Sequence, residues 1–167
     1  MRSVTLLCLL LALSAQPALA ASLTDSMLGR LVGTWTVTGT TQGSQTNFTN
    51  TGAEVRTQFY NSFIEIHISD PSGRSPYEVR LFIGEAKDGT IIAHWLDGGG
   101  AERSRILGTG RIIDDRIELR FPYPDGEFRR KIEYDRLRDR WRLLIETGSE
   151  KEPKTFSDWY FERVKMR

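Results

Sequence analysis

Histidine side chains can act as acids or bases and can bind metals near neutral pH, and this chain has two of them. His94 lies in an apolar stretch, residues 91–96. There it could act as an acid or base beside Asp97 or Glu102, or bind haem. A single histidine in such a stretch is more often a core or rim residue. Because His67 and His94 lack His-x-x-x-His spacing, we predict no metal site and no cofactor, with haem on His94 as the alternative.

The usual signatures of nucleophilic catalysis do not occur in the sequence. It contains no Gly-x-Ser-x-Gly pattern, which exposes a catalytic serine at a strand-to-helix turn. The single cysteine, Cys8, lies in an N-terminal apolar run that we expect to be removed. The sequence therefore favours a binding protein over an enzyme. An enzyme with His94 as its acid or base is the alternative.

Arg130 is the side chain that points most directly to a ligand. It shares one face of an alternating stretch with Phe128 and Tyr134. If that face points into the protein, Arg130 is a buried cation, and a buried charge requires a partner. The anionic head group of a ligand would supply one. Arg80 and Arg105 are weaker candidates for the same role.

Strands must position these side chains, because the sequence from residue 33 onward is a series of alternating stretches separated by turns. Residues 64–68 place three isoleucines on one face, and Asp88-Gly89 is a strong hairpin signal. A strand is expected over residues 103–113. Only Leu23–Leu31 looks helical.

The number and spacing of these stretches predict the fold class. We count about ten strands joined mostly by tight turns, which is typical of an antiparallel meander. Closing such a meander into a ring removes its exposed edges. The sequence therefore predicts an all-β protein. Its fold is a single antiparallel up-and-down β-barrel of about ten strands, with a short N-terminal helical turn closing one end.

The two ends of the chain carry residues suited to sealing such a barrel. Gly33 permits a tight approach of the backbone, and Trp35 supplies a large ring at the start of the first strand. Trp159, Phe161 and Arg163 share one face of the last stretch, and an arginine can stack on an indole. We predict that Gly33, Trp35, Trp159 and Arg163 together close one end of the barrel.

The N-terminal segment predicts export from the cytoplasm. Residues 1–20 combine Arg2, an apolar run too short to span a bilayer and the small-residue cleavage site Ala18-Leu19-Ala20, as signal peptides do. We expect cleavage near Ala20, a single domain over residues 21–167, and a periplasmic or secreted protein. Without Arg2 the basic and acidic residues are equal in number, so nucleic acid and anionic membranes are not expected partners. No second stretch is apolar enough to span a membrane.

The chain resembles the calycins, the superfamily of lipocalins and fatty-acid-binding proteins. Within it the sequence is most similar to bacterial lipocalin-like proteins of the DUF1579 type. The resemblance is carried by Gly33-Thr34-Trp35, Trp95-Leu96-Asp97, Asp125-Gly126-Glu127-Phe128 and the late Arg163. Unlike true lipocalins, the chain has no cysteine pair and no obvious helix after the last strand. The resemblance implies a barrel with a cavity, but no particular ligand.

A barrel with a cavity suggests a protein that encloses a small apolar or amphipathic molecule. The alternating pattern leaves open which face of each strand lines the lumen. The alternative to a ligand site is a barrel filled by its own aromatic side chains, which would make it a structural or envelope protein. The residues expected to contact a ligand are Trp95, His94, Arg130, Tyr134, Leu81 and Phe121.

Overall fold

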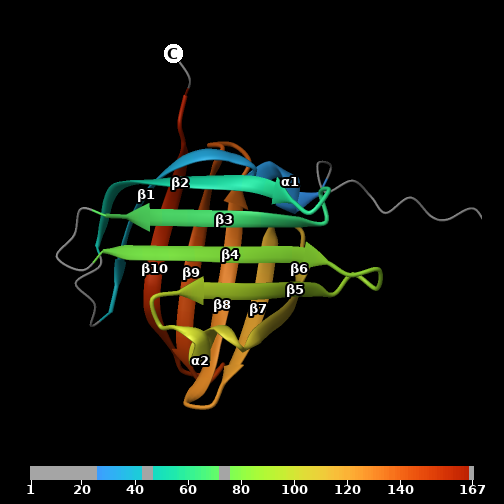
Figure 1. Cartoon of the computed structure of the whole chain (residues 1–167), viewed down its shortest axis with the longest axis vertical. Helices are drawn as coiled ribbons and strands as arrows, with labels where there is room; N and C mark the ends of the chain where they lie inside the picture. Colours follow the sequence, from blue (N-terminus) through green and yellow to red (C-terminus); the bar gives the residue numbers. More distant parts are fainter. Residues whose placement is uncertain (1–25, 43–46, 72–75, 166–167) are drawn as a thin grey trace, which may run out of the picture.

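The computed structural model describes residues 26–42, 47–71 and 76–165, which form one closed antiparallel β-barrel (Figure 1). The strands are β1 (Gly33–Thr41), β2 (Phe48–Gln58), β3 (Phe63–Asp70), β4 (Tyr77–Glu85), β5 (Ile91–Asp97), β6 (Leu107–Ile113), β7 (Arg116–Tyr123), β8 (Gly126–Asp135), β9 (Arg140–Gly148) and β10 (Pro153–Arg163). The described residues also form two short helices, α1 (Met27–Leu31) and α2 (Ala101–Ser104).

The predicted all-β, up-and-down topology is confirmed. Each strand pairs with its neighbours in the sequence, and β1 pairs with β10 to close the ring. Helix α1 precedes the first strand, as expected. The predicted signal peptide, residues 1–20, and the expected domain start at residue 21 lie outside the described residues.

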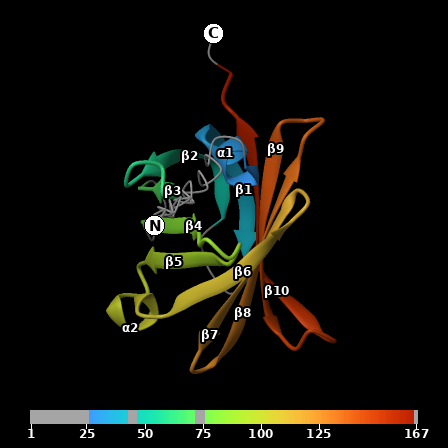
Figure 2. The same ribbon diagram turned by 90° about the vertical axis from the view of Figure 1, so that its right-hand side faces the viewer.

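The barrel has two walls. In Figure 1, β2 to β5 run across β7 to β10, which lie behind them. Figure 2 shows β6 running obliquely from one wall to the other, beside α2. Side chains from both walls pack against one another between them, so the core of the protein lies in the barrel lumen.

Alternation along each strand determines which side chains face this lumen. On β3, Ile64, Ile66 and Ile68 are almost completely buried. His67 points the other way and lies 2.8 Å from a carboxylate oxygen of Glu78 on the outer surface. The inward face of β3 is therefore its isoleucine face.

The start of β6 differs from the sequence-based expectation. The predicted strand over residues 103–113 begins only at Leu107, because residues 101–104 form the helical turn α2. The backbone N–H of Arg105 donates to the carbonyl of Ala101 at 3.1 Å, which ends this turn. Gly108 then allows the ring of Phe121 to lie against the strand, since a Cβ at this position would overlap that ring.

One end of the barrel is closed by contacts between α1, β1 and β10. Trp35 is fully buried, and its indole N–H donates to the carbonyl of Leu31 at 2.8 Å. The guanidinium of Arg163 lies 4.1 Å from the centre of the Trp35 ring. It also donates to the carbonyls of Arg30 and Val32, at 2.9 and 3.0 Å. These contacts hold α1 across the end of the barrel.

Glycine suits this end of the barrel better than a residue with a side chain. The φ of Gly33, 145°, is in a region that side chains disfavour, and a Cβ would overlap the guanidinium of Arg163. The expectation that Trp159 joins the same closure is wrong. Trp159 is four residues from Arg163 on an extended strand, which separates them by about 13 Å. Its ring instead packs 5.0 Å from that of Phe48.

Aromatic side chains fill the half of the lumen nearest this closed end. The rings of Trp141 and Phe161 are stacked, and Trp35 meets Trp141 edge-on with ring centres 5.9 Å apart. Leu28 and Leu31 of α1 are fully buried in the same core. This half of the barrel therefore has no room for a ligand.

We expect Trp35→Ala to lower the free energy of unfolding by about 3–5 kcal/mol, because it leaves a cavity and removes the surface on which Arg163 lies. Urea unfolding of the purified protein measures this change. Leu137→Ala is the control, because Leu137 is 94% exposed and its loss should change stability by less than about 0.5 kcal/mol. An unchanged unfolding midpoint for Trp35→Ala would refute the closure.

The closed end should also contribute to the acid sensitivity of the protein. A hydrogen bond from Arg163 lowers the pKa of the Asp139 carboxyl. A carboxyl whose pKa falls on folding stabilises the protein above its unfolded-state pKa of about 3.9, and this stabilisation is lost as the pH falls through the folded-state pKa.

We expect Asp139→Asn to lower the free energy of unfolding by about 0.5–1 kcal/mol at pH 7, because the pair is half exposed. The difference from wild type should disappear by about pH 2–3, where the native carboxyl is protonated. Urea unfolding at both pH values measures it. Glu85→Gln, which removes an exposed charge elsewhere, is the control. A difference that persisted unchanged in acid would contradict the ion-pair origin.

Candidate functional site

The other half of the barrel encloses a cavity of about 320 Å³. It lies where β1 ends and β4, β8 and β10 begin, away from α1. Six of its thirteen lining residues are aromatic. The lining residues are Thr41, Tyr77, Trp95, Asp97, Gly99, Arg103, Tyr123, Phe128, Arg130, Ile145, Phe156, Ser157 and Trp159.

Strand pairing places these side chains at the same height along the barrel axis. Arg130 lies on the inward face of β8, directly between Leu119 of β7 and Ile145 of β9. Trp95 lies on the inward face of β5, and its ring centre is 6.2 Å from that of Trp159 on β10. Residues from both walls of the barrel thus meet around one space.

Arg130 is the buried cation of this cavity. Its side chain is only 4% exposed, and its guanidinium carbon lies 4.3 Å from the centre of the Trp95 ring and 3.8 Å from that of Phe121. Two of its nitrogens, Nε and Nη1, are buried and have no hydrogen-bond partner among the described residues. Burial lowers the pKa of Arg130, and the neighbouring Tyr123 and Asp97 oppose this only in part. The site therefore holds a desolvated positive charge whose donors are not all used.

The other polar groups of the cavity are engaged with one another. The carboxylate of Asp97 accepts from the indole N–H of Trp95 at 2.7 Å and from the backbone N–H of Gly99 at 2.8 Å. Arg103 pairs with Asp125 at 2.7 Å, outside the barrel mouth. Asp97 and Arg103 therefore have their own partners, and the Nε and Nη1 donors of Arg130 have none among the described residues.

One tyrosine of the lining, Tyr77, is neutral at physiological pH. Burial raises the pKa of Tyr77 well above its usual range, so its phenol keeps its proton. Tyr123 lies under the guanidinium of Arg103, at 5.7 Å from ring centre to carbon. The mouth of the cavity is thus bordered by aromatic rings and an exposed cation.

The predicted ligand residues divide into three groups. Trp95 and Arg130 line the cavity. Phe121 contacts Arg130, and Leu81 pairs with Trp95 across β4 and β5, but both belong to the packed core rather than to the lining. Tyr134 does not lie near Arg130. It is four residues along an extended strand, and its hydroxyl donates to Asp139 at 2.7 Å, at the closed end.

The expectation that His94 contacts an enclosed ligand is wrong. Neighbouring residues of a strand point to opposite faces, and Trp95 is the inward one. His94 Nε2 lies outside, 2.5 Å from the carbonyl oxygen of Ser104, to which it donates. Asp97 faces the cavity and Glu102 pairs with Arg105 at 3.4 Å, so the structure does not assemble an acid–base pair around His94.

The other arginines singled out in the sequence lie on the outer surface with acidic partners. Arg80 donates to Glu65 at 2.7 Å and also pairs with Glu78, while Arg105 pairs with Glu102. Neither has a buried donor without a partner. Among the described residues, no group of three or more histidine, cysteine, aspartate or glutamate side chains could hold a metal ion.

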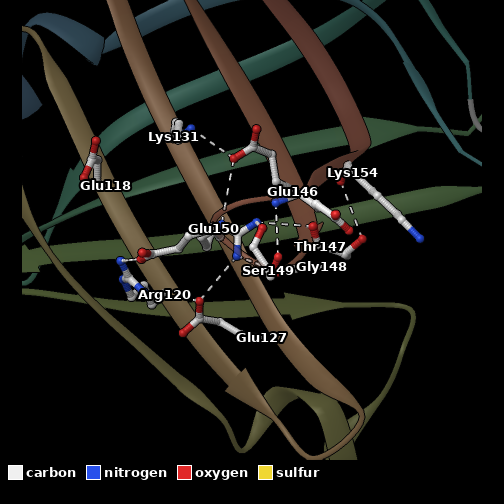
Figure 3. Close-up of polar contacts among 12 residues, drawn as sticks. Glu118, Arg120, Glu127, Lys131, Glu146, Thr147, Gly148, Ser149, Glu150 and Lys154 are labelled. Carbon is white, nitrogen blue, oxygen red and sulfur yellow. Dashed lines mark hydrogen bonds and ion pairs between the residues drawn. The ribbon is translucent and has the colours of Figure 1, made fainter.

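Arg129, the neighbour of Arg130 in β8, is a buried arginine whose terminal nitrogens have hydrogen-bond partners. It is buried on the outer face and donates to the carbonyls of Thr147, Gly148 and Ser149, at 3.2, 2.7 and 3.2 Å. Figure 3 shows these carbonyl-bearing residues beside Glu146, whose carboxylate pairs with the ammonium of Lys131 at 3.0 Å. This outer network ties the start of β8 to the turn between β9 and β10, and it gives both terminal nitrogens of Arg129 a partner.

Sequence reasoning did not identify the rest of the aromatic lining, namely Tyr77, Tyr123, Phe128, Phe156 and Trp159. All but Trp159 lie within a few residues of the end of a strand. An inward-facing aromatic residue near a turn is the signal that could have found the first four of them, whereas Trp159 lies in the middle of β10 and only strand register places it in the cavity.

Comparison with known proteins adds no family. Neither the family models nor the curated proteins compared with this chain match it. In the described part of the chain, no helix is long and apolar enough to cross a membrane.

The two neighbouring arginines should respond oppositely to the same substitution. We expect Arg130→Met to raise the free energy of unfolding by about 1 kcal/mol. The substitution removes a buried cation with unpaired donors, and this gain exceeds the loss of the contacts between the guanidinium and the rings. Arg129→Met should lower the free energy of unfolding by about 2–3 kcal/mol, since three carbonyls lose a charged donor. Thermal and urea unfolding measure both. A large loss of stability in Arg130→Met would indicate that Arg130 is purely structural.

Proposed function

We propose that this protein binds a small amphipathic molecule by enclosing it in the hollow half of its barrel. Arg130 pairs with the negatively charged group of the ligand, and the aromatic wall removes the rest from water. The single observation that carries this proposal is the buried guanidinium of Arg130, with Nε and Nη1 unpartnered, in the wall of a 320 Å³ cavity.

The energetics of Arg130 support an anionic ligand. Holding a cation away from water is costly, and its ring contacts compensate only part of that cost. An anion that accepts from the free donors forms a charge-assisted hydrogen bond in a medium of low dielectric constant, where such bonds are strong. A neutral ligand would leave the cost in place. Binding of an anionic ligand would therefore neutralise the buried charge of Arg130 in the same step.

The resemblance to the calycins is consistent with this role. We propose that the protein is a calycin-like barrel of the DUF1579 type and that it acts in the periplasm or outside the cell, after cleavage near Ala20. Gly33, Trp35 and Arg163 meet at one end of the ring, and the cavity lies at the other. The mechanism is encapsulation and release, with no chemical step.

Native mass spectrometry of the protein purified from its own host tests the proposal. We expect a retained small molecule of defined mass that carries an acidic group, and its loss from Arg130→Met. Arg105→Met is the matched control, because this arginine is exposed on the outer surface and should keep the bound mass. A clean apo mass for wild type, unchanged after exposure to lipids, haem and small organic acids, would instead favour a filled barrel with a structural role.

A further inference from the structure

The size of the cavity limits the length of what Arg130 can hold. Its volume of about 320 Å³ is at the lower end of the usual range for small-molecule sites, about 300–1,000 Å³. The lumen beyond it is filled by Trp35, Trp141 and Phe161. An anion seated on Arg130 therefore cannot extend a long tail further into the lumen, and a tail that left through the mouth would lose its burial.

The wall chemistry favours a flat ligand. The rings of Trp95 and Trp159 lie 6.2 Å apart and are inclined by 31°, and Tyr77 meets Trp159 edge-on at 6.2 Å. Tyr123 of β7 and Phe128 of β8 meet edge-on at 5.5 Å. The cavity is thus lined by both the faces and the edges of aromatic rings. An aromatic ligand gains from offset stacking and edge-to-face contacts in addition to burial, whereas an alkyl chain gains from burial alone.

The guanidinium of Arg130 adds a directional requirement. Two ring faces lie against it, those of Trp95 and Phe121, so its unpartnered N–H groups point within its own plane. A carboxylate that accepts from them lies in that plane. In an arenecarboxylate the ring continues in the same plane, which directs it along the neighbouring aromatic wall.

The charge distribution favours one negative group over two. Asp97 lines the same cavity and already accepts two hydrogen bonds, from Trp95 and Gly99. The second cation of the lining, Arg103, is paired with Asp125. A second carboxylate on the ligand would therefore face Asp97 without a free cation.

We infer that the cavity selects a compact aromatic monocarboxylate over an aliphatic acid of similar size. This inference rests on the proposed function, because it requires that Arg130 bind an anion. It adds the shape and charge of the ligand, which the cavity volume, the ring geometry and Asp97 supply.

Calorimetric titration of the purified protein with four probes tests the inference. The probes are 2-naphthoate, decanoate, the neutral 2-naphthol and 2,6-naphthalenedicarboxylate. We expect 2-naphthoate to bind at least tenfold more tightly than each of the others. Arg130→Met should weaken 2-naphthoate at least tenfold and leave 2-naphthol unchanged, while Arg105→Met should change neither.

A second variant tests the aromatic wall separately from the charge. Trp95→Leu should reduce the preference for 2-naphthoate over decanoate several-fold, and circular dichroism would establish that the barrel is intact. Decanoate binding as tightly as 2-naphthoate, with both lost in Arg130→Met, would overturn the aromatic selectivity and leave the anion site standing. Equal binding of the dicarboxylate would overturn the single-charge requirement. Binding of none of the acids would overturn both this inference and the proposed function.

Discussion

The pairing of β1 with β10 is the constraint on which the rest of the structure depends. Once these strands are joined, the sheet has no edge and every strand has an inner and an outer face. Trp35 and Arg163 are direct partners in this pairing, so the contact that seals one end also sets the register of the ring. That register determines which side chains stand at the same level across the lumen. The cavity is a consequence of this arrangement.

The division between inside and outside is clearest at two consecutive residues of β8. Arg129 reaches three carbonyl groups on the outer surface, whereas Arg130 reaches aromatic rings in the lumen. The two side chains have the same chemistry, and only the alternation of the strand separates them. One arginine stabilises a hairpin. The other is a buried cation, and none of the residues that the structure describes supplies a hydrogen-bond partner to its Nε and Nη1 donors.

The fold was predictable because turns and alternating stretches are local properties of the sequence. The burial of Arg130 followed from its place on the face of Phe128, once that face was known to be inward. The outward position of His94 did not follow, since both faces of β5 are largely apolar. The position of each residue along the barrel axis could not be predicted from the sequence either. Trp159 and Tyr134 were assigned to the wrong ends because only cross-strand register shows how far along the axis a residue stands.

The contrast between a packed half and a hollow half implies an uneven distribution of stability along the barrel axis. Trp35, Trp141 and Phe161 are almost completely buried, so we expect the backbone amides around them to exchange only when the whole molecule unfolds. Around Tyr123 and Phe128, the strand ends enclose empty volume and can separate in local excursions at a smaller energetic cost. Under the proposed function, the strand ends that a ligand would have to separate are thus the least stable part of the barrel, and the packed half would stay folded while the ligand enters and leaves.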